Sequence, residues 1–196
     1  MDLPYFVDDL REHWYAKESG MDPVRPCNLI AFMAQLTALR VWNSGLSSLA
    51  IQTFKKSFEV ERPPIDENAS SNLESLTILV PECTEWIQHY GHKLSYFRDH
   101  EHTFLGSRRD KKDAELKPGP LASNEGVEYE GLSLDRCLFW RARFRDMSRS
   151  KDKKLPSDGR AGYCQIIVIG KQSGHTIPGE AEYEEKSCSF LHRSSI

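Results

Sequence analysis

Four histidines lie within fourteen positions in the middle of the chain, at His89, His92, His100 and His102. Imidazole is the commonest transition-metal ligand in proteins, so this cluster is the sharpest suggestion of chemistry in the sequence. His89 and His92 could share one helix face, but no HExxH motif, CxxC pair or paired carboxylate completes a ligand shell. We therefore expect solvated or core histidines and no metal site here.

A second set of possible ligands lies near the end of the chain, at Cys164, His175, Cys188 and His192. Zinc modules usually supply their ligands as close pairs, and only the last two residues approach that spacing. The five cysteines are odd in number and widely spaced, so we expect reduced thiols rather than a disulfide framework. The sequence predicts no metal in this segment either.

Motifs for nucleophilic catalysis or nucleotide binding are absent from the sequence. It contains no GxSxG elbow, no GxxxxGK[ST] loop and no GxGxxG fingerprint, which are the arrangements that expose a nucleophile or cradle a phosphate. Adjacent carboxylates such as Asp8 and Asp9 point apart on a helix, so they are poorly placed for acid and base chemistry. We expect no cofactor, and the sequence assigns no catalytic residue.

The composition excludes several other classes of protein. The net charge is -3, with a sequence pI near 6.2, which gives no overall attraction to polyanions. The N-terminus carries acidic residues where a signal peptide needs a basic flank, and no apolar run approaches the roughly 20 residues that cross a bilayer. These features predict a soluble protein of the cytoplasm or nucleus with no membrane partner.

Apolar residues recur at helical spacing over most of the chain. Five helices are predicted in this way, over about residues 3–14, 28–42, 46–58, 76–97 and 134–147. Pro81 either bends the fourth helix or divides it into two nearly collinear ones, and Ser133 is placed to cap the last one. The predicted fold is all-α, an irregular helical bundle of about five to six helices.

Two segments break the helical pattern. Residues 99–131 lose their periodicity and form a charged stretch, which predicts a loop that is either disordered or functional. Disorder is the simpler interpretation. Beyond Arg149 the chain is basic, then β-like in the run YCQIIVIG, then rich in glycine, serine and glutamate. We therefore expect a helical domain over 1–148 and an irregular tail of low order over 149–196.

Three blocks of sequence occur in a recognisable order: NLIAFMAQLTALRVW, LVPECTEWIQHYGHKLSYF and GLSLDRCLFWRARF. Together they resemble the fungal helical family known as domain of unknown function 3632, over about residues 4–148. The resemblance implies an all-helical domain and a fungal source, but no activity, substrate or catalytic residue. The family pattern would continue as helix after the last block, whereas this chain becomes basic and then β-like.

Basic residues are concentrated where the last predicted helix ends. The stretch contains Arg136, Arg141, Arg143, Arg145, Arg149, Lys151, Lys153 and Lys154. Such a patch could contact phosphates, but a solvated face balanced by the acidic first helix is the simpler interpretation. Phe139, Trp140 and Phe144 interleave with the arginines, and in a helix such aromatics are more often core than platforms for bases. Nucleic-acid binding is therefore not expected.

Two functions remain open from the sequence. The first is a non-catalytic module that binds a protein partner, because a good helical core is present without a catalytic constellation. The alternative is an enzyme or metal-binding protein with a pocket between helices, since such sites need not form linear motifs. The residues expected in a pocket or interaction surface are Trp86, His89, Tyr90, Trp140 and Arg141.

Overall fold

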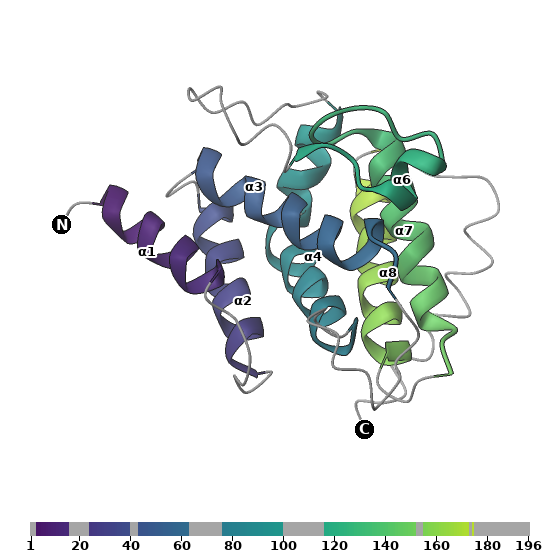
Figure 1. The fold of residues 1–196 in the computed structure, drawn as a ribbon, viewed down its shortest axis with the longest axis horizontal. Helices are drawn as coiled ribbons and strands as arrows, with labels where there is room; N and C mark the ends of the chain where they lie inside the picture. Colours follow the sequence, from purple (N-terminus) through teal and green to yellow (C-terminus); the bar gives the residue numbers. More distant parts are fainter. Residues whose placement is uncertain are drawn as a thin grey trace.

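The computed structural model describes residues 3–15, 24–39, 43–62, 76–99, 116–151, 155–172 and 174. These residues form helices and connecting turns without a strand (Figure 1), which confirms the all-α prediction for the described chain. The elements are α1 (Leu3–Tyr15), α2 (Val24–Ala38), α3 (Asn43–Phe54), the π-helical turn η1 (Lys55–Glu59), α4 (Leu76–Asp99), α6 (Pro120–Asn124), α7 (Leu134–Ser148) and α8 (Leu155–Gln172).

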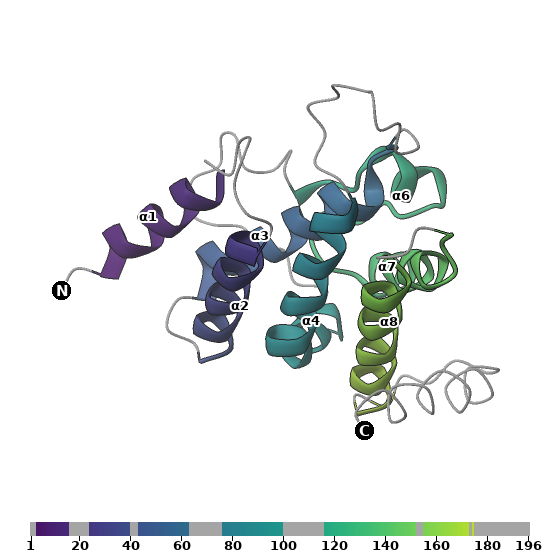
Figure 2. The same ribbon diagram turned by 90° about the horizontal axis from the view of Figure 1, so that it is seen from below.

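The longest helix, α4, lies at the centre of the bundle. Helices α2 and α8 pack on opposite sides of it, and α7 packs on α8 (Figures 1 and 2). Helix α3 crosses α4 and continues into η1, which reaches α6. Helix α1 lies at the outer edge and touches α2 and α3.

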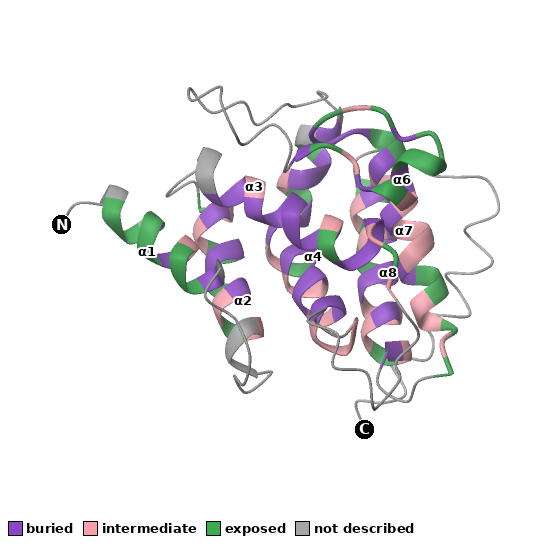
Figure 3. Cartoon of the chain, viewed as in Figure 1, coloured by how far each residue is buried: buried purple, intermediate pink, exposed green. Residues whose placement is uncertain are grey.

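The burial pattern explains why α4 occupies the centre. Buried residues recur along α4 (Figure 3), and the apolar ones follow helical spacing: Leu79, Val80, Cys83, Trp86, Ile87, Tyr90 and Leu94. Such a wide apolar arc is typical of a helix with neighbours on several faces. Of the two alternatives for Pro81, the structure has one helix that runs through it.

Helix α7 begins as its sequence predicts. The backbone N–H of Arg136 donates to Oγ of Ser133 at 3.2 Å, so Ser133 is the N-cap. This bond satisfies one of the amides that the first turn of a helix leaves without a partner. Trp140 and Phe144 are buried. Trp140 stacks on Phe54 of α3 with 4.4 Å between the ring centroids, and Phe144 meets Phe54 and Phe58 edge to face. Their burial confirms that these two rings belong to the core.

Helix α8 corrects the prediction of a low-order tail over 149–196. The run YCQIIVIG, expected to be β-like, is helical, and the helix spans Leu155–Gln172. It buries Leu155, Tyr163 and Ile167 in the common core, so the helical packing does not end at residue 148. The remainder of the expected tail, over 175–196, lies outside the described residues.

Two glycines of α8 explain why the sequence pattern did not indicate a helix here. A Cβ at Gly162 would lie 2.2 Å from Cε1 of Phe144, and a Cβ at Gly159 would lie 2.6 Å from the backbone N of Ser148. Only glycine therefore allows α8 to approach α7 so closely. Glycine and β-branched residues have poor helix propensity, so this helix is stabilised by its tertiary contacts rather than by its local sequence.

The prediction of a disordered loop over 99–131 is also wrong for part of its length. Asp99 ends α4, and residues 116–131 include α6 and bury Leu116, Ala122 and Val127. These apolar residues are too widely spaced to show a periodic pattern, which is why the segment resembled a loop. Residues 100–115 lie outside the described chain.

None of the described helices combines the length and the apolar character that a membrane-spanning helix requires.

We predict that Gly159→Ala lowers the free energy of unfolding by about 1–3 kcal/mol, the range for overpacking a core. Alanine normally favours a helix over glycine by about 1 kcal/mol, so a loss would show that the contact with Met147 and Ser148 dominates. Urea unfolding followed by circular dichroism measures the change. Gln165→Ala, at an exposed position of α8, is the control and should stay within about 0.5 kcal/mol of the parent.

Candidate functional site

Two charged side chains, Glu59 and Arg136, are fully shielded from solvent between η1 and α7. Glu59 closes the π-helical turn, in which the three consecutive residues Ser57, Phe58 and Glu59 are all buried. A π-helical turn often accompanies a functional site, and a buried charge is costly unless it is paired. Both features make the Glu59–Arg136 pair a candidate site.

The carboxylate of Glu59 accepts four hydrogen bonds. Oε1 accepts from Nε of Arg136 at 2.7 Å and from Nε1 of Trp140 at 2.6 Å. Oε2 accepts from Nη2 of Arg136 at 2.9 Å and from the backbone N of Gly119 at 2.6 Å. The arginine bonds are bidentate, which is the strongest geometry for this pair.

The other side of the Arg136 guanidinium is also occupied. Nη1 donates to the carbonyl oxygens of Leu116 at 2.7 Å and Gly131 at 2.6 Å. Nη2 also donates to the carbonyl oxygen of Lys117 at 3.4 Å. The guanidinium thus ties both ends of the segment 116–131 to α7.

This arrangement leaves little capacity for chemistry at the ion pair. A carboxylate has about four acceptor sites, and all four are used by groups of the same chain. Without a vacant acceptor or access to solvent, Glu59 cannot act as a general base or bind a metal ion in this geometry. We conclude that the ion pair is structural and that the candidate site must lie elsewhere.

Trp86 and Tyr90, two of the residues expected in a pocket or surface, are buried against α3. Nε1 of Trp86 donates to Oγ1 of Thr53 at 3.2 Å, and the hydroxyl groups of Tyr90 and Ser47 are 2.7 Å apart. Burial raises the pKa of the Tyr90 phenol from 10.0 to about 12, and its hydrogen bond with Ser47 offsets part of the rise. Both polar atoms therefore join α3 to α4 rather than facing a ligand.

His89 and Arg141 are half-buried. Nε2 of His89 lies 3.3 Å from Oε2 of Glu85, one turn earlier on α4. His92 is exposed. Partial desolvation of its ring, and secondly the nearby charge of Lys93, lower the pKa of this imidazole. Within the described chain, no three histidine, cysteine or acidic side chains lie together as metal ligands.

Most of the other histidines and cysteines that were considered as possible ligands lie outside the described residues. His100 and His102 lie outside the described residues, as do His175, Cys188 and His192. Cys164, the remaining member of that set, is buried in α8.

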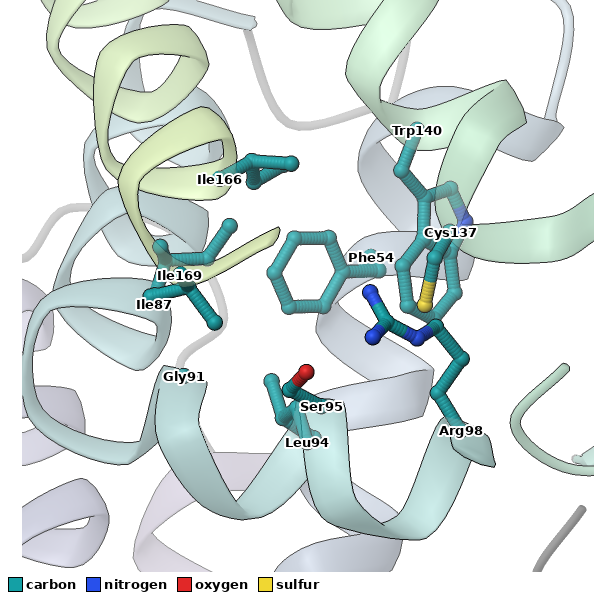
Figure 4. Close-up of a pocket in the computed structure, with 10 residues that line it drawn as sticks. All are labelled: Phe54, Ile87, Gly91, Leu94, Ser95, Arg98, Cys137, Trp140, Ile166 and Ile169. Atoms are coloured by element: carbon teal, nitrogen blue, oxygen red, sulfur yellow. The ribbon is translucent and has the colours of Figure 1, made fainter. Parts of the chain in front are cut away.

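A pocket between α4, α7 and α8 is a candidate binding site in the described part of the chain (Figure 4). It is partly open to solvent, and its water-accessible volume is about 40 Å³. Its apolar lining consists of Phe54, Ile87, Leu94, Trp140, Ile166 and Ile169, with Gly91 on the α4 side. Its polar side chains are those of Ser95, Arg98 and Cys137.

Of the five residues expected to form a pocket or surface, Trp140 alone lines this one. Sequence reasoning missed Arg98, because a single arginine near a helix end gives no signal of burial. It also placed Arg136 in an exposed basic patch, whereas the structure buries it. The local sequence around Glu59 did not indicate its buried ion pair either, since its partner is 77 residues away in the sequence.

Glu59→Gln should lower the free energy of unfolding by about 3–5 kcal/mol, because it leaves the Arg136 guanidinium buried without a counter-charge. The double variant Glu59→Gln, Arg136→Met should lose less than the sum of the two single variants, which urea unfolding of all three measures. Glu130→Gln is the control, since its ion pair with Lys117 is half exposed and should contribute at most about 1 kcal/mol. Additive losses would contradict the coupling.

The raised pKa of Tyr90 predicts that the folded protein loses stability at alkaline pH. Because its folded pKa is raised, the stabilisation is complete below pH 10.0 and is lost as the pH rises through about 12. Tyr90→Phe should lower the stability at pH 7 by about 1 kcal/mol through the lost hydrogen bond, and should flatten the decline above pH 10. Tyr96→Phe, at an exposed position, should leave the profile unchanged. Equal alkaline profiles for the Tyr90 variant and the parent would refute this role.

Comparison with known proteins places the chain in a family. The family described as Protein of unknown function (DUF3632) matches residues 1–144, which include α1 to α6 and most of α7. No curated protein and no solved structure gives a significant match. The match extends over most of the chain and agrees with the resemblance of its three sequence blocks, so this all-α protein belongs to the DUF3632 family.

Proposed function

We propose that this protein is a non-catalytic interaction module that binds a basic, partly apolar segment of a partner protein through α1 and α2. The observation that carries the proposal is a set of exposed aromatic side chains beside exposed carboxylates on these two helices. The residues of this α1–α2 surface are Tyr5, Phe6, Asp8, Asp9, Glu12, Phe32 and Leu39.

The apolar part of the surface extends over both helices. Tyr5 is 72% exposed and Leu39 is 74% exposed, and the rings of Phe6 and Phe32 meet edge to face with 6.3 Å between their centroids. Phe32 is exposed on α2, and Leu39 is exposed in the turn that directly follows the last residue of α2. Aromatic residues are enriched at protein interfaces, and a cluster of exposed apolar side chains often marks one.

The acidic part of the surface favours a basic partner. Asp8, Asp9 and Glu12 are exposed on α1, and their helical spacing places them around Tyr5. A partner with lysine or arginine residues around an apolar anchor would complement both components. Such charges mainly increase the association rate and the specificity.

The opposite face of α1 attaches it to the rest of the protein. Leu10 and Trp14 are buried in the core, and Nζ of Lys56 lies 4.2 Å from the centroid of the Trp14 ring. These contacts use one stripe of the helix, so Tyr5 and the carboxylates remain available to a partner without unfolding α1.

The alternative of an enzyme or metal-binding protein has less support. The residues that line the inter-helix pocket include no carboxylate or imidazole, the groups most often used as general acids and bases. The volume of this pocket, about 40 Å³, is also small for an active site, because ligand sites for drug-sized molecules measure about 300–1,000 Å³.

A peptide titration tests the proposed interaction. The probe is a synthetic amphipathic helix with lysines on one face and leucine and tryptophan on the other. Fluorescence anisotropy should give saturable binding that weakens as the salt concentration rises, because exposed charges are screened. The doubly reversed variant Asp8→Lys, Glu12→Lys should bind about tenfold more weakly, as should Tyr5→Ala.

The matched control reverses two exposed charges at a distance from this surface, in the variant Glu125→Lys, Glu128→Lys. It has the same net charge as the α1 variant and should bind like the parent. Equal weakening by both double variants would show only a general charge effect and would contradict the proposal. Binding of an acidic peptide of the same apolar pattern with similar affinity would contradict it too.

A further inference from the structure

The outer side of α7 carries a basic, partly apolar surface. Leu134 and Leu138 lie in the first two turns of the helix, exposed and half-buried respectively, and Arg145 is exposed in its last turn. Their helical spacing places these three side chains along one side of α7. Arg149 and Lys151 follow directly and are also exposed. These five residues are called the α7 surface.

Positive charge prevails in this part of the chain. Between residues 134 and 151, Arg136 is buried against Glu59 and does not contribute to the surface. The remaining basic residues are Arg141, Arg143, Arg145, Arg149 and Lys151, whereas the acidic ones are Asp135 and Asp146. Oδ2 of Asp146 lies 4.0 Å from Nη1 of Arg143, so it is directed toward a different arginine from Arg145. The second half of α7 therefore has a net positive charge.

The acidic helix α1 lies too far from α7 to neutralise this charge within one molecule. The two helices are near opposite ends of the structure, with α2 and α4 between them (Figures 1 and 2). Each intervening helix is about 10 Å across, and exposed charges are screened over about 8 Å at physiological ionic strength. The acidic and basic surfaces therefore act on each other mainly between molecules.

The two surfaces also match in pattern. Tyr5 and Glu12 of α1 are seven residues apart, and so are Leu138 and Arg145 of α7. At about 1.5 Å per residue, both pairs extend over about 10 Å along one side of a helix. When α7 of another copy lies parallel to α1, the tyrosine ring meets Leu138. The Glu12 carboxylate then meets the Arg145 guanidinium.

Apolar groups and charges would both contribute to this contact. Tyr5 on α1 and Leu134 on α7 are large apolar side chains exposed to solvent, and covering them removes apolar surface from water. The opposite charges beside them fix the orientation and increase the association rate. A basic, partly apolar helix is also the chemistry that complements the α1–α2 surface.

From these features we infer that the partner of the α1–α2 surface is a second copy of this chain, bound through its α7 surface. The inference rests on the proposed function and names the partner. Because the two surfaces are different, the contact joins the copies head to tail. Each contact leaves one surface of either kind for a further copy, so the assembly grows with concentration or closes into a ring.

Sedimentation velocity of the full chain tests the self-association. The weight-average mass should rise above that of the monomer as the protein concentration increases. It should fall again as salt is added, because exposed charges are screened. The amphipathic lysine and leucine peptide should also lower the mass, since it competes for the α1–α2 surface. A chain that stays monomeric at every concentration would overturn the inference.

Charge reversal tests which surfaces meet. The two variants are Asp8→Lys, Glu12→Lys on α1 and Arg145→Glu, Lys151→Glu on α7. Each alone should self-associate at least about tenfold more weakly than the parent. An equimolar mixture of the two should associate again, because every contact in it joins opposite charges. A misfolded variant would not be rescued in this way, so the mixture separates recognition from folding.

The control for net charge is the variant Glu125→Lys, Glu128→Lys, whose altered residues lie outside both surfaces. It has the same net charge as the α1 variant and should self-associate like the parent. Equal weakening of the control would show a general charge effect and contradict the inference. A mixture of the two reversed variants that stays monomeric, although circular dichroism shows both to be folded, would contradict it too.

A photo-crosslinker at Tyr5 maps the contact directly. The chain with benzoylphenylalanine at this position is mixed with isotopically heavy parent chain and irradiated. Mass spectrometry should find cross-links from the light chain to heavy peptides that contain Leu134 or Leu138. Cross-links between chains that involve only other helices would show a different interface and overturn the inference.

The peptide titration distinguishes failure of this inference from failure of the proposed function. If the peptide binds but the chain remains monomeric, the α1–α2 surface recognises another protein and the self-association is refuted alone. If neither the peptide nor a second copy binds, both are refuted.

Discussion

The buried ion pair between Glu59 and Arg136 constrains three parts of the chain at once. Glu59 comes from the π-helical turn after α3, Arg136 comes from the first turn of α7, and their remaining hydrogen bonds hold the segment 116–131. The four bonds of the carboxylate and the two bonds from Nη1 of Arg136 are buried, so losing one partner would leave another without compensation. The network joins η1 to α7, and Trp140, which donates to Glu59, also stacks on Phe54 of α3.

At the interface between α3 and α4, buried polar groups are likewise hydrogen-bonded within the protein. Trp86 and Tyr90 bury large aromatic rings and satisfy their polar atoms with Thr53 and Ser47. Groups that could have performed chemistry at the protein surface therefore serve the packing of the core. The outer face of α1 with its neighbour α2 carries exposed aromatic and acidic side chains, and a small pocket lies between α4, α7 and α8 beside Arg98.

Close helix contacts at glycines determine the geometry around that pocket. Gly159 and Gly162 bring α8 onto α7, and Gly91 brings it onto α4, so α8 touches both neighbours. A side chain at any of these positions would separate the helices and change the width of the pocket. The apolar walls and the position of Ile169 thus follow from backbone packing, which is why the pocket can be preformed.

The sequence alone determined the elements with strong periodicity. Apolar residues at helical spacing identified α1, α3, α4 and α7, and Ser133 was recognised as a cap because capping is a local interaction. The helix over 155–172 depends on tertiary contacts, since its glycines and β-branched residues are unfavourable in isolation and are stabilised by contacts with α4 and α7. It alone also decided that Arg136 is buried and that Arg98 lines a pocket, because the environment of an arginine depends on residues far away in the sequence.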